Sequence, residues 1–154
     1  MDVKNSRRLD RALEICLSGK KFSEIRQKKE PLFDILQIGL TFPKNILDKR
    51  IDERVEARLK QKMINEVKKL HKSGVRWKRL DDFGLEYRFI SRYLREIYSE
   101  SEMIDKLKIA IHQFAKRQMT WFRRMERNGL PIHWIDGNLS LERKIEQIHD
   151  IIKS

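Results

Sequence analysis

The stretch LFDILQIGLTF, residues 32–42, decides the fold class of this sequence. Its apolar side chains follow one another with few interruptions: Phe33, Ile35, Leu36, Ile38, Leu40 and Phe42. The run is too short for a typical helix, so it predicts a strand at about residues 32–42 that is buried on both faces. Strands of this kind belong to parallel sheets, whose two faces are covered by crossover helices.

The sequence offers one further strand candidate, PIHWI at residues 131–135. Two strands make a poor sheet, so two explanations stay open. Either residues 32–42 do not form a strand, or the other strands of its sheet lie on polypeptide outside this sequence.

Helical periodicity dominates the remainder of the chain. Apolar residues spaced three and four apart predict helices at about residues 6–18, 43–72, 84–98, 101–127 and 140–152. Gly19 stands where a left-handed residue ends a helix, and Pro43 stands at the first position of the longest helical region. Ser99 or Ser101 can cap the helix that follows, and Trp77 falls in a predicted loop. The fold class is therefore mainly α.

The charge balance favours a polyanionic partner. The 154 residues include 35 Lys and Arg against 23 Asp and Glu, for a net charge of +12, and such an excess is typical of nucleic-acid binding. Cys16 is the single cysteine, so we expect a buried, unpaired thiol rather than a disulfide or a zinc site. No signal-peptide h-region and no run of about 18 apolar residues is present, so we expect a cytoplasmic protein without a membrane partner.

Several motifs of catalytic proteins are absent from the sequence. Neither G-x-x-x-x-G-K-[ST] nor G-x-G-x-x-G occurs, so no loop that cradles phosphates can be assigned. The four histidines do not have metal-ligand spacing, and no metal site is expected: His71, His112, His133 and His149. No Ser or Cys nucleophile motif is recognisable either.

Arginines on predicted helices are the main candidates for chemistry. Arg7, Arg8 and Arg11 lie within one turn near a helix start, where they can converge on a phosphate or simply form a solvated turn. Arg50 and Arg54 share a helix face, from which they can point into a cleft or outward into solvent.

The segment FAKRQMTWFRRMER, residues 114–127, combines cations with an aromatic ring. Lys116, Arg117, Arg123 and Arg124 could contact an RNA backbone, and Trp121 could stack on a base. A tryptophan at helical spacing is more often a core or rim residue, so we expect Trp121 to be mainly structural.

Four blocks in order give the sequence a family resemblance: RRLDRALEICLSGK (7–20), LDKRIDERVEARL (47–59), FGLEYRFISRYL (83–94) and FAKRQMTWFRR (114–124). Together they resemble the C-terminal half of tRNA dimethylallyltransferases, also called tRNA isopentenyltransferases, over about residues 5–136. The resemblance implies the helical C-terminal portion of a P-loop kinase-like α/β fold. Residues 1–30 would end the tRNA-binding insertion, 31–136 would supply a core strand and helices, and 137–154 would form a C-terminal helix.

The resemblance also implies roles for particular residues. Arg54 matches the family arginine that contacts the substrate diphosphate and is the candidate catalytic residue, and Arg117 is a second diphosphate candidate. The implied tRNA contacts are Arg7, Arg8, Arg11, Asp81, Asp82, Phe83, Gly84, Leu85, Glu86, Lys116 and Gln118. The family usually has xxIGYKE where this chain has DDFGLEY at residues 81–87, so the Gly84 turn is kept while the next two residues differ.

The function implied is transfer of a dimethylallyl group from dimethylallyl diphosphate to N6 of the adenosine 3′ of the anticodon in tRNA. The family's P-loop, its general base and the Mg²⁺ of the complete enzyme would belong to an N-terminal half, and one alternative is that this half is encoded separately. We therefore expect this chain to be a fragment that binds no metal and is inactive alone, with the tRNA anticodon arm and dimethylallyl diphosphate as partners. The alternative is a stand-alone basic RNA-binding helical module without catalysis.

Overall fold

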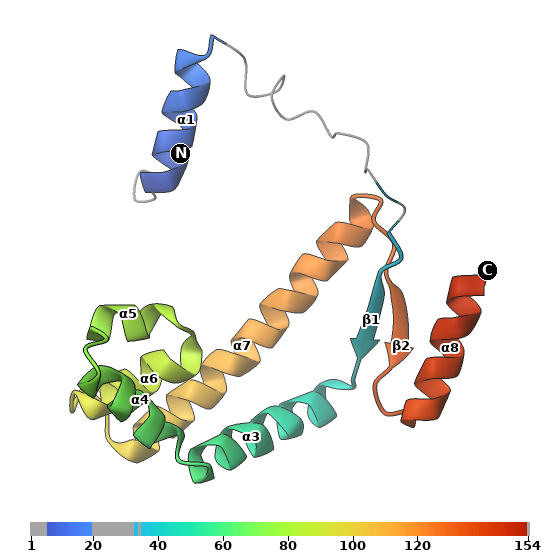
Figure 1. Ribbon diagram of the computed structural model, residues 1–154. Helices are drawn as coiled ribbons and strands as arrows, with labels where there is room; N and C mark the ends of the chain where they lie inside the picture. Colours follow the sequence, from blue (N-terminus) through green and yellow to red (C-terminus); the bar gives the residue numbers. More distant parts are fainter. Residues whose placement is uncertain (1–5, 20–32, 34, 154) are drawn as a thin grey trace. The chain divides into compact units, whose positions relative to one another are not determined.

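The computed structural model describes residues 6–19, 33 and 35–153 (Figure 1). The chain divides into two compact units, Met1–Ile35 and Leu36–Ser154. The first unit contains α1 (Ser6–Leu17), which is followed by Gly19 in the left-handed region at φ 68°. This confirms the predicted helix at 6–18. The prediction of a buried thiol is wrong, because Cys16 is exposed.

The second unit contains two strands and six helices among its described residues. In chain order they are β1 (Ile38–Thr41), α3 (Lys44–Lys60), α4 (Met63–Lys72), α5 (Trp77–Asp82), α6 (Leu85–Leu94), α7 (Glu100–Arg127), β2 (His133–Asp136) and α8 (Leu141–Lys153). Helix α3 follows β1 directly, and α7 leads into β2 (Figure 1). The helices between them therefore connect two strands that lie side by side.

The strands form a parallel pair, in which Ile38 is opposite His133 and Thr41 is opposite Asp136. Gly39 allows this pairing, because a Cβ atom there would lie 2.6 Å from the ring of Trp134. The mainly α fold and both predicted strands are thus confirmed. Strand β2 ends one residue later than the predicted segment.

The predicted burial of the strand at 32–42 on both faces is wrong for its described residues. The strand itself is only four residues long, and the side chain of Leu40 is 53% exposed. Strand β1 has a single neighbour, β2, and α8 packs against β2. Among the described elements, nothing else supplies the covering helices that a central parallel strand requires.

The helix predicted at 43–72 is two helices. Helix α3 ends at Lys60, and Lys62 adopts a left-handed conformation at φ 65° before α4 begins. For a non-glycine residue this costs roughly 1–2 kcal/mol. The change of direction lets α3 pack against α7 while α4 packs against α6. Buried Met63 and Val67 on α4 offset the cost of the break.

The predicted loop around Trp77 is also wrong, because Trp77 begins the short helix α5. Its ring stacks on His71 with centroids 3.6 Å apart, and Leu80 on the same helix is fully buried. The core that α5 joins is formed by buried residues of α4 to α7: Met63, Val67, Leu80, Ile90 and Met103.

Helix α7 is fixed at its start by a capping box. The Ser99 side chain accepts a hydrogen bond from the Glu102 backbone N–H, and the Ser99 backbone N–H donates to the Glu102 carboxylate. Ser99 is therefore the cap, one of the two serines that the sequence offered. From this start α7 runs for 28 residues to Arg127.

Candidate functional site

Arg54 lies on α3 at the edge of a small hollow between α3, α4, α6 and α7. One guanidinium nitrogen, Nη2, is 3.5 Å from Oε1 of Glu86, and the Arg54 side chain is 73% exposed. Arg58 is a second cation in the lining of the hollow. The other lining residues are apolar: Ile51, Val55, Leu59, Met63, Leu107 and Ile111. The site thus holds two guanidinium groups above an apolar floor, with a single carboxylate opposite.

The candidate tRNA turn, residues 81–86, joins α5 to α6. Gly84 has φ 142°, in the region that favours glycine. The Asp81 carboxylate accepts a hydrogen bond of 2.6 Å from the hydroxyl of fully buried Ser91. The Asp81 carbonyl accepts another from Nε of Arg88, at 3.0 Å. These two hydrogen bonds, which come from Ser91 and Arg88 on α6, hold Asp81 at the start of the turn.

The same turn presents an aromatic side chain to solvent. Phe83 is exposed, with the Arg79 guanidinium 5.3 Å from its ring centroid and Tyr87 edge-on to it. The Tyr87 hydroxyl donates a hydrogen bond to the Glu66 carboxylate, and this interaction raises the pKa of Tyr87. Of the remaining turn residues, Asp82 is exposed and Leu85 is half-buried.

Two contacts between α3 and α7 hold the wall of the hollow. Nζ of Lys108 donates a hydrogen bond of 2.7 Å to Glu56, which lowers the pKa of Glu56 and raises that of Lys108. One turn away, Nε2 of His112 is 3.1 Å from Oδ1 of Asp52, although this contact lacks hydrogen-bond geometry. The helices therefore run antiparallel at this contact.

Arg117 lies further along α7, in a different hollow. Its neighbours there are Phe114, Gln118, Trp121 and Phe122. In the antiparallel register of the α3–α7 contacts residue 110 is opposite Arg54, so Arg117 lies about 10 Å further along α7 at 1.5 Å per residue. The described hollows thus separate the two candidate diphosphate contacts. Lys116, one residue before Arg117, is exposed.

Of the core or rim position expected for Trp121, the structure shows the rim. Its side chain is 59% exposed, and its indole ring meets Phe122 edge-on. Phe122 in turn meets Trp134, whose Nε1–H donates to Glu126. Within the described residues, Trp121 forms the outer end of this aromatic row.

The arginines of α1 lie in the first unit. Arg7 is exposed, and Arg11 forms an ion pair of 2.7 Å with Glu14 on the next turn of the helix. Arg8 belongs to α1, but its side chain lies outside the described residues. These arginines therefore belong to a different unit from Arg54.

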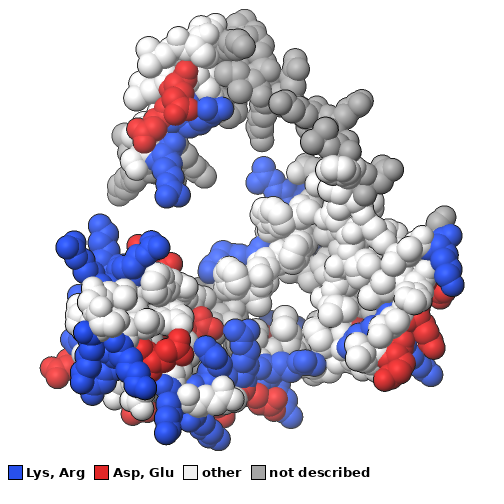
Figure 2. Space-filling model, in the orientation of Figure 1, with Lys and Arg blue, Asp and Glu red and all other residues white. Residues whose placement is uncertain are grey.

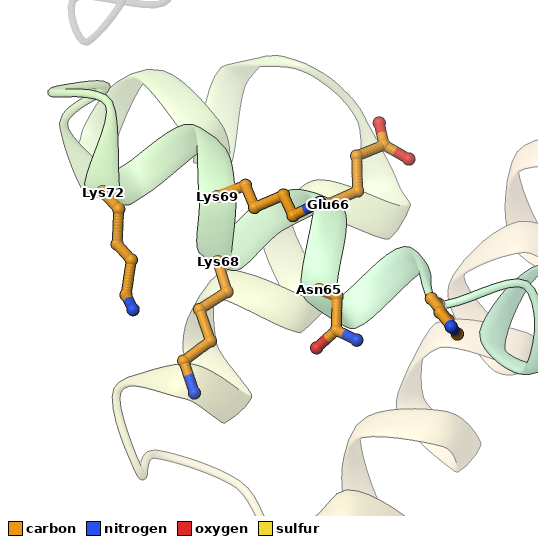
Figure 3. Close-up of a pocket in the computed structure, with 6 residues that line it drawn as sticks. Asn65, Glu66, Lys68, Lys69 and Lys72 are labelled. Atoms are coloured by element: carbon orange, nitrogen blue, oxygen red, sulfur yellow. The ribbon is translucent and has the colours of Figure 1, made fainter.

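Sequence reasoning missed two features of this region. Ser91 was not singled out, and a buried serine on a helix has no signature without the contact to Asp81. The second feature is the concentration of lysines at the start of α4 and along it, which line the hollow in Figure 3: Lys62, Lys68, Lys69 and Lys72. Counted over residues 44–79, with 13 Lys and Arg against five acids, these cations indicate an ordinary solvated face, whereas a count over 62–79 isolates the excess.

Metal and membrane features are lacking within the described part of the chain. It contains no group of three His, Cys, Asp or Glu that could hold a metal ion. None of its helices is both long enough and apolar enough to cross a bilayer.

The geometry defines a class of protein. It is a basic helical unit that has guanidinium groups around a small hollow, together with a two-stranded parallel sheet.

A family model described as IPP transferase matches residues 1–125. The chain is 47% identical over 138 residues to tRNA dimethylallyltransferase 2 of Pelobacter propionicus, covering 88% of this chain and 43% of that protein. It is 42% identical over 153 residues to tRNA dimethylallyltransferase 1 of Syntrophus aciditrophicus, covering 99% and 50%.

A solved structure agrees with these matches. The full-length tRNA isopentenylpyrophosphate transferase of Bacillus halodurans superposes with a TM-score of 0.71 at 31% identity, covering 99% of this chain and 46% of that one. This chain therefore belongs to the IPP transferase family. It spans half or less of the length of these relatives.

Proposed function

We propose that this chain contributes to transfer of a dimethylallyl group from dimethylallyl diphosphate to N6 of the adenosine 3′ of the anticodon in tRNA. Its part would be to supply RNA contacts and one wall of the diphosphate site. Membership of a family whose relatives are named tRNA dimethylallyltransferases supports this proposal. The geometric observation that carries it is the contact between Arg54 and Glu86, which joins the candidate diphosphate residue to the candidate RNA turn.

The chemistry assigned to Arg54 follows from the reaction. As the adenosine N6 bonds to the dimethylallyl carbon, the carbon–oxygen bond to diphosphate breaks and negative charge grows on the leaving group. A guanidinium group can offer two parallel N–H donors to phosphate oxygens. Such preorganised donors stabilise the transition state more than the ground state.

Glu86 would hold Arg54 in place until the diphosphate arrives. An exposed ion pair contributes only about 0–1 kcal/mol, and the Arg54 side chain is 73% exposed. The negatively charged diphosphate can therefore replace the Glu86 carboxylate beside Arg54 at a small cost in free energy. Arg58 lines the same hollow and leaves the site cationic when Glu86 is displaced.

Arg117 would make a second phosphate contact from α7, and Lys116 and Gln118 would contact the nucleotide. Its separate hollow supports a role distinct from that of Arg54. Arg7, Arg8 and Arg11 would contact the tRNA from the first unit, together with the turn at 81–86. These assignments rest on the family motifs and on the exposure of Arg7, Arg11 and Arg117.

The phosphate-binding loop and general base would come from other polypeptide, since the 154 residues contain no match to the loop motif. The Mg²⁺ expected for the complete enzyme does not fit the described residues of this chain, which offer no carboxylate or histidine cluster for it. We therefore assign no step to the metal here.

A transfer assay tests the proposal. The chain is incubated with tRNA and labelled dimethylallyl diphosphate, alone and with a polypeptide that carries the P-loop half of a relative. We expect label in tRNA only from the mixture. In that mixture, Arg54→Gln should lower turnover about 100-fold, the loss typical for one transition-state donor, while tRNA affinity changes little.

Lys60→Gln is the matched control, because Lys60 is exposed on the same helix and lies outside the hollow. Glutamine is preferred to glutamate at position 54, since a new carboxylate would repel Glu86. If the two variants lose the same amount of turnover, Arg54 has no specific role in the diphosphate site. Turnover by the chain alone would contradict the division of labour between the two polypeptides.

A stand-alone RNA-binding module is the second candidate function, and the exposed Trp121 beside Arg117 favours it. Such a module would bind tRNA with strong salt dependence. It would give no transfer with any P-loop polypeptide.

A further inference from the structure

The positive charge of this protein is concentrated in one short part of the chain. From residue 62 to residue 79 there are seven Lys and Arg and a single acid, Glu66, which together account for half of the net charge of +12. The seven cations are Lys62, Lys68, Lys69, Lys72, Arg76, Lys78 and Arg79, which we call the α4–α5 basic surface. Figure 2 shows Lys and Arg side chains gathered over the end of the second unit that contains these helices.

The cations of this surface outnumber the acids near them and are not engaged in ion pairs within the described residues. All seven cations are exposed, and none of them has an ion pair within the described residues. The single acid, Glu66, is engaged by the Tyr87 hydroxyl. The seven cations are therefore not held in ion pairs within the described chain, and the nearest further acids in sequence, Asp81 and Asp82, stand at the end of α5.

Helix α3 provides the comparison within the same molecule. It has six Lys and Arg against four acids, and three of its cations are paired: Lys44 with Asp48, Lys49 with Glu53, and Arg54 with Glu86. This is the pattern of an ordinary solvated helix face. The α4–α5 basic surface therefore differs from α3 in having more cations per acid and in having no cation in an ion pair within the described residues.

The lysines of α4 are also arranged around a hollow (Figure 3). Asn65, Lys68 and Lys72 point to the same side of the helix, as expected for residues three and four apart. Helix α4 has 10 residues, a length of about 15 Å. Successive cations can therefore meet successive phosphates along one strand, and the amide of Asn65 adds a hydrogen-bonding group between them.

The composition of the surface selects among polyanionic partners. None of the exposed large hydrophobic residues lies within 62–79, and Phe83, the exposed ring just beyond it, lies against the Arg79 guanidinium, so the surface has few of the apolar side chains that insert into a bilayer. Lysine is also depleted at protein–protein interfaces. Exposed lysines with few apolar neighbours fit the ribose-phosphate backbone of a nucleic acid.

We propose that the α4–α5 basic surface binds the phosphate backbone of an RNA stem without reading its sequence. The proposal rests on the RNA-binding role given above and adds a surface that the family motifs did not indicate. Met63 lines the Arg54 hollow while its neighbour Lys62 lines the lysine hollow, so the two sites adjoin. The backbone contact would orient the RNA while the Arg54 region meets the reacting end.

The test is tRNA binding as a function of salt, for the full chain and for the triple variant Lys68→Gln, Lys69→Gln, Lys72→Gln. Each phosphate contact contributes about 0.7–0.9 to the slope of log affinity against log salt. We expect the triple variant to lose about 2 units of slope and to bind at least about tenfold more weakly at low salt. An isolated stem-loop and an unrelated RNA duplex should respond alike, since only the backbone is recognised.

The matched control is the variant Lys44→Gln, Lys49→Gln, Lys60→Gln, which removes the same charge from exposed positions of α3. Circular dichroism verifies that both variants fold, and Lys→Arg at residues 68, 69 and 72 should restore the slope. Equal losses in the two triple variants would overturn the proposal, as would preferential binding to one RNA sequence. If the unaltered chain binds no tRNA, the proposed RNA role fails as well, whereas unchanged binding by the triple variant refutes only the surface.

Discussion

Ser91→Ala should destabilise the chain through the candidate RNA turn. Ser91 is fully buried, and its hydroxyl lies 2.6 Å from the Asp81 carboxylate and 3.0 Å from the Arg88 carbonyl. A hydrogen bond to a charged group contributes about 1.5–3 kcal/mol. Asp81 is only half-buried, so water replaces part of the bond, and we expect a loss near the lower end, about 1.5 kcal/mol.

Urea unfolding followed by circular dichroism measures this loss, and for a chain of this size it corresponds to a fall in Tm of about 3–6 °C. Hydrogen exchange of the amides at residues 83–86 should also accelerate, because Asp81 begins the turn. Ser73→Ala is the control, since the Ser73 hydroxyl donates to the Leu70 carbonyl at an exposed position. It should change stability by less than about 0.5 kcal/mol. If both variants behave alike, Ser91 does not hold the turn.

Two further predictions concern other elements. In Gly137→Ala, the new Cβ atom would lie 2.1 Å from the Phe42 ring, so we expect urea unfolding to show a loss of about 1–3 kcal/mol of stability. When Phe42→Ala is also present, adding Gly137→Ala should cost much less, because the clashing ring is gone. Hydrogen bonds from the Ser99 backbone and side chain lower the pKa of Glu102 below 4.5, so the stability they contribute is complete above that pH and is lost as the pH falls through the lowered pKa. Between about pH 5 and pH 3 the parent should lose stability faster than Glu102→Gln, and parallel curves would contradict this.

Local rules were sufficient to predict where most helices lie. The capping serine before α7, the glycine after α1 and the apolar stripe of α8 each act within a few residues of the chain, so the sequence displays them directly. The strand at β1 was also visible, because an apolar run between polar segments has few alternatives. The second strand, at about residues 131–135, was also a candidate, but its parallel pairing with β1 was not predicted from the sequence.

Features that depend on tertiary contact were not predictable in this way. Nothing at Gln61 or Lys62 resembles a helix breaker, and the change of direction there places Met63 and Val67 in the core that α4 shares with α5, α6 and α7. The burial expected for β1 failed for a similar reason, since it depends on elements that cover the sheet. The family motifs identified Arg54. Its contact with Glu86 joins two residues that are 32 positions apart in the sequence, so the sequence alone does not show this contact.

The parallel strand pair also governs the order in which the molecule can assemble. Ile38 pairs with His133, about 95 positions later, and closing a loop of that length costs about 4 kcal/mol in chain entropy on the logarithmic scaling. The contacts of Glu56 with Lys108 and of Asp52 with His112 bridge much of that separation beforehand. Kinetically, the strands should therefore associate last during refolding and come apart first under denaturant, after the helices between them have already formed.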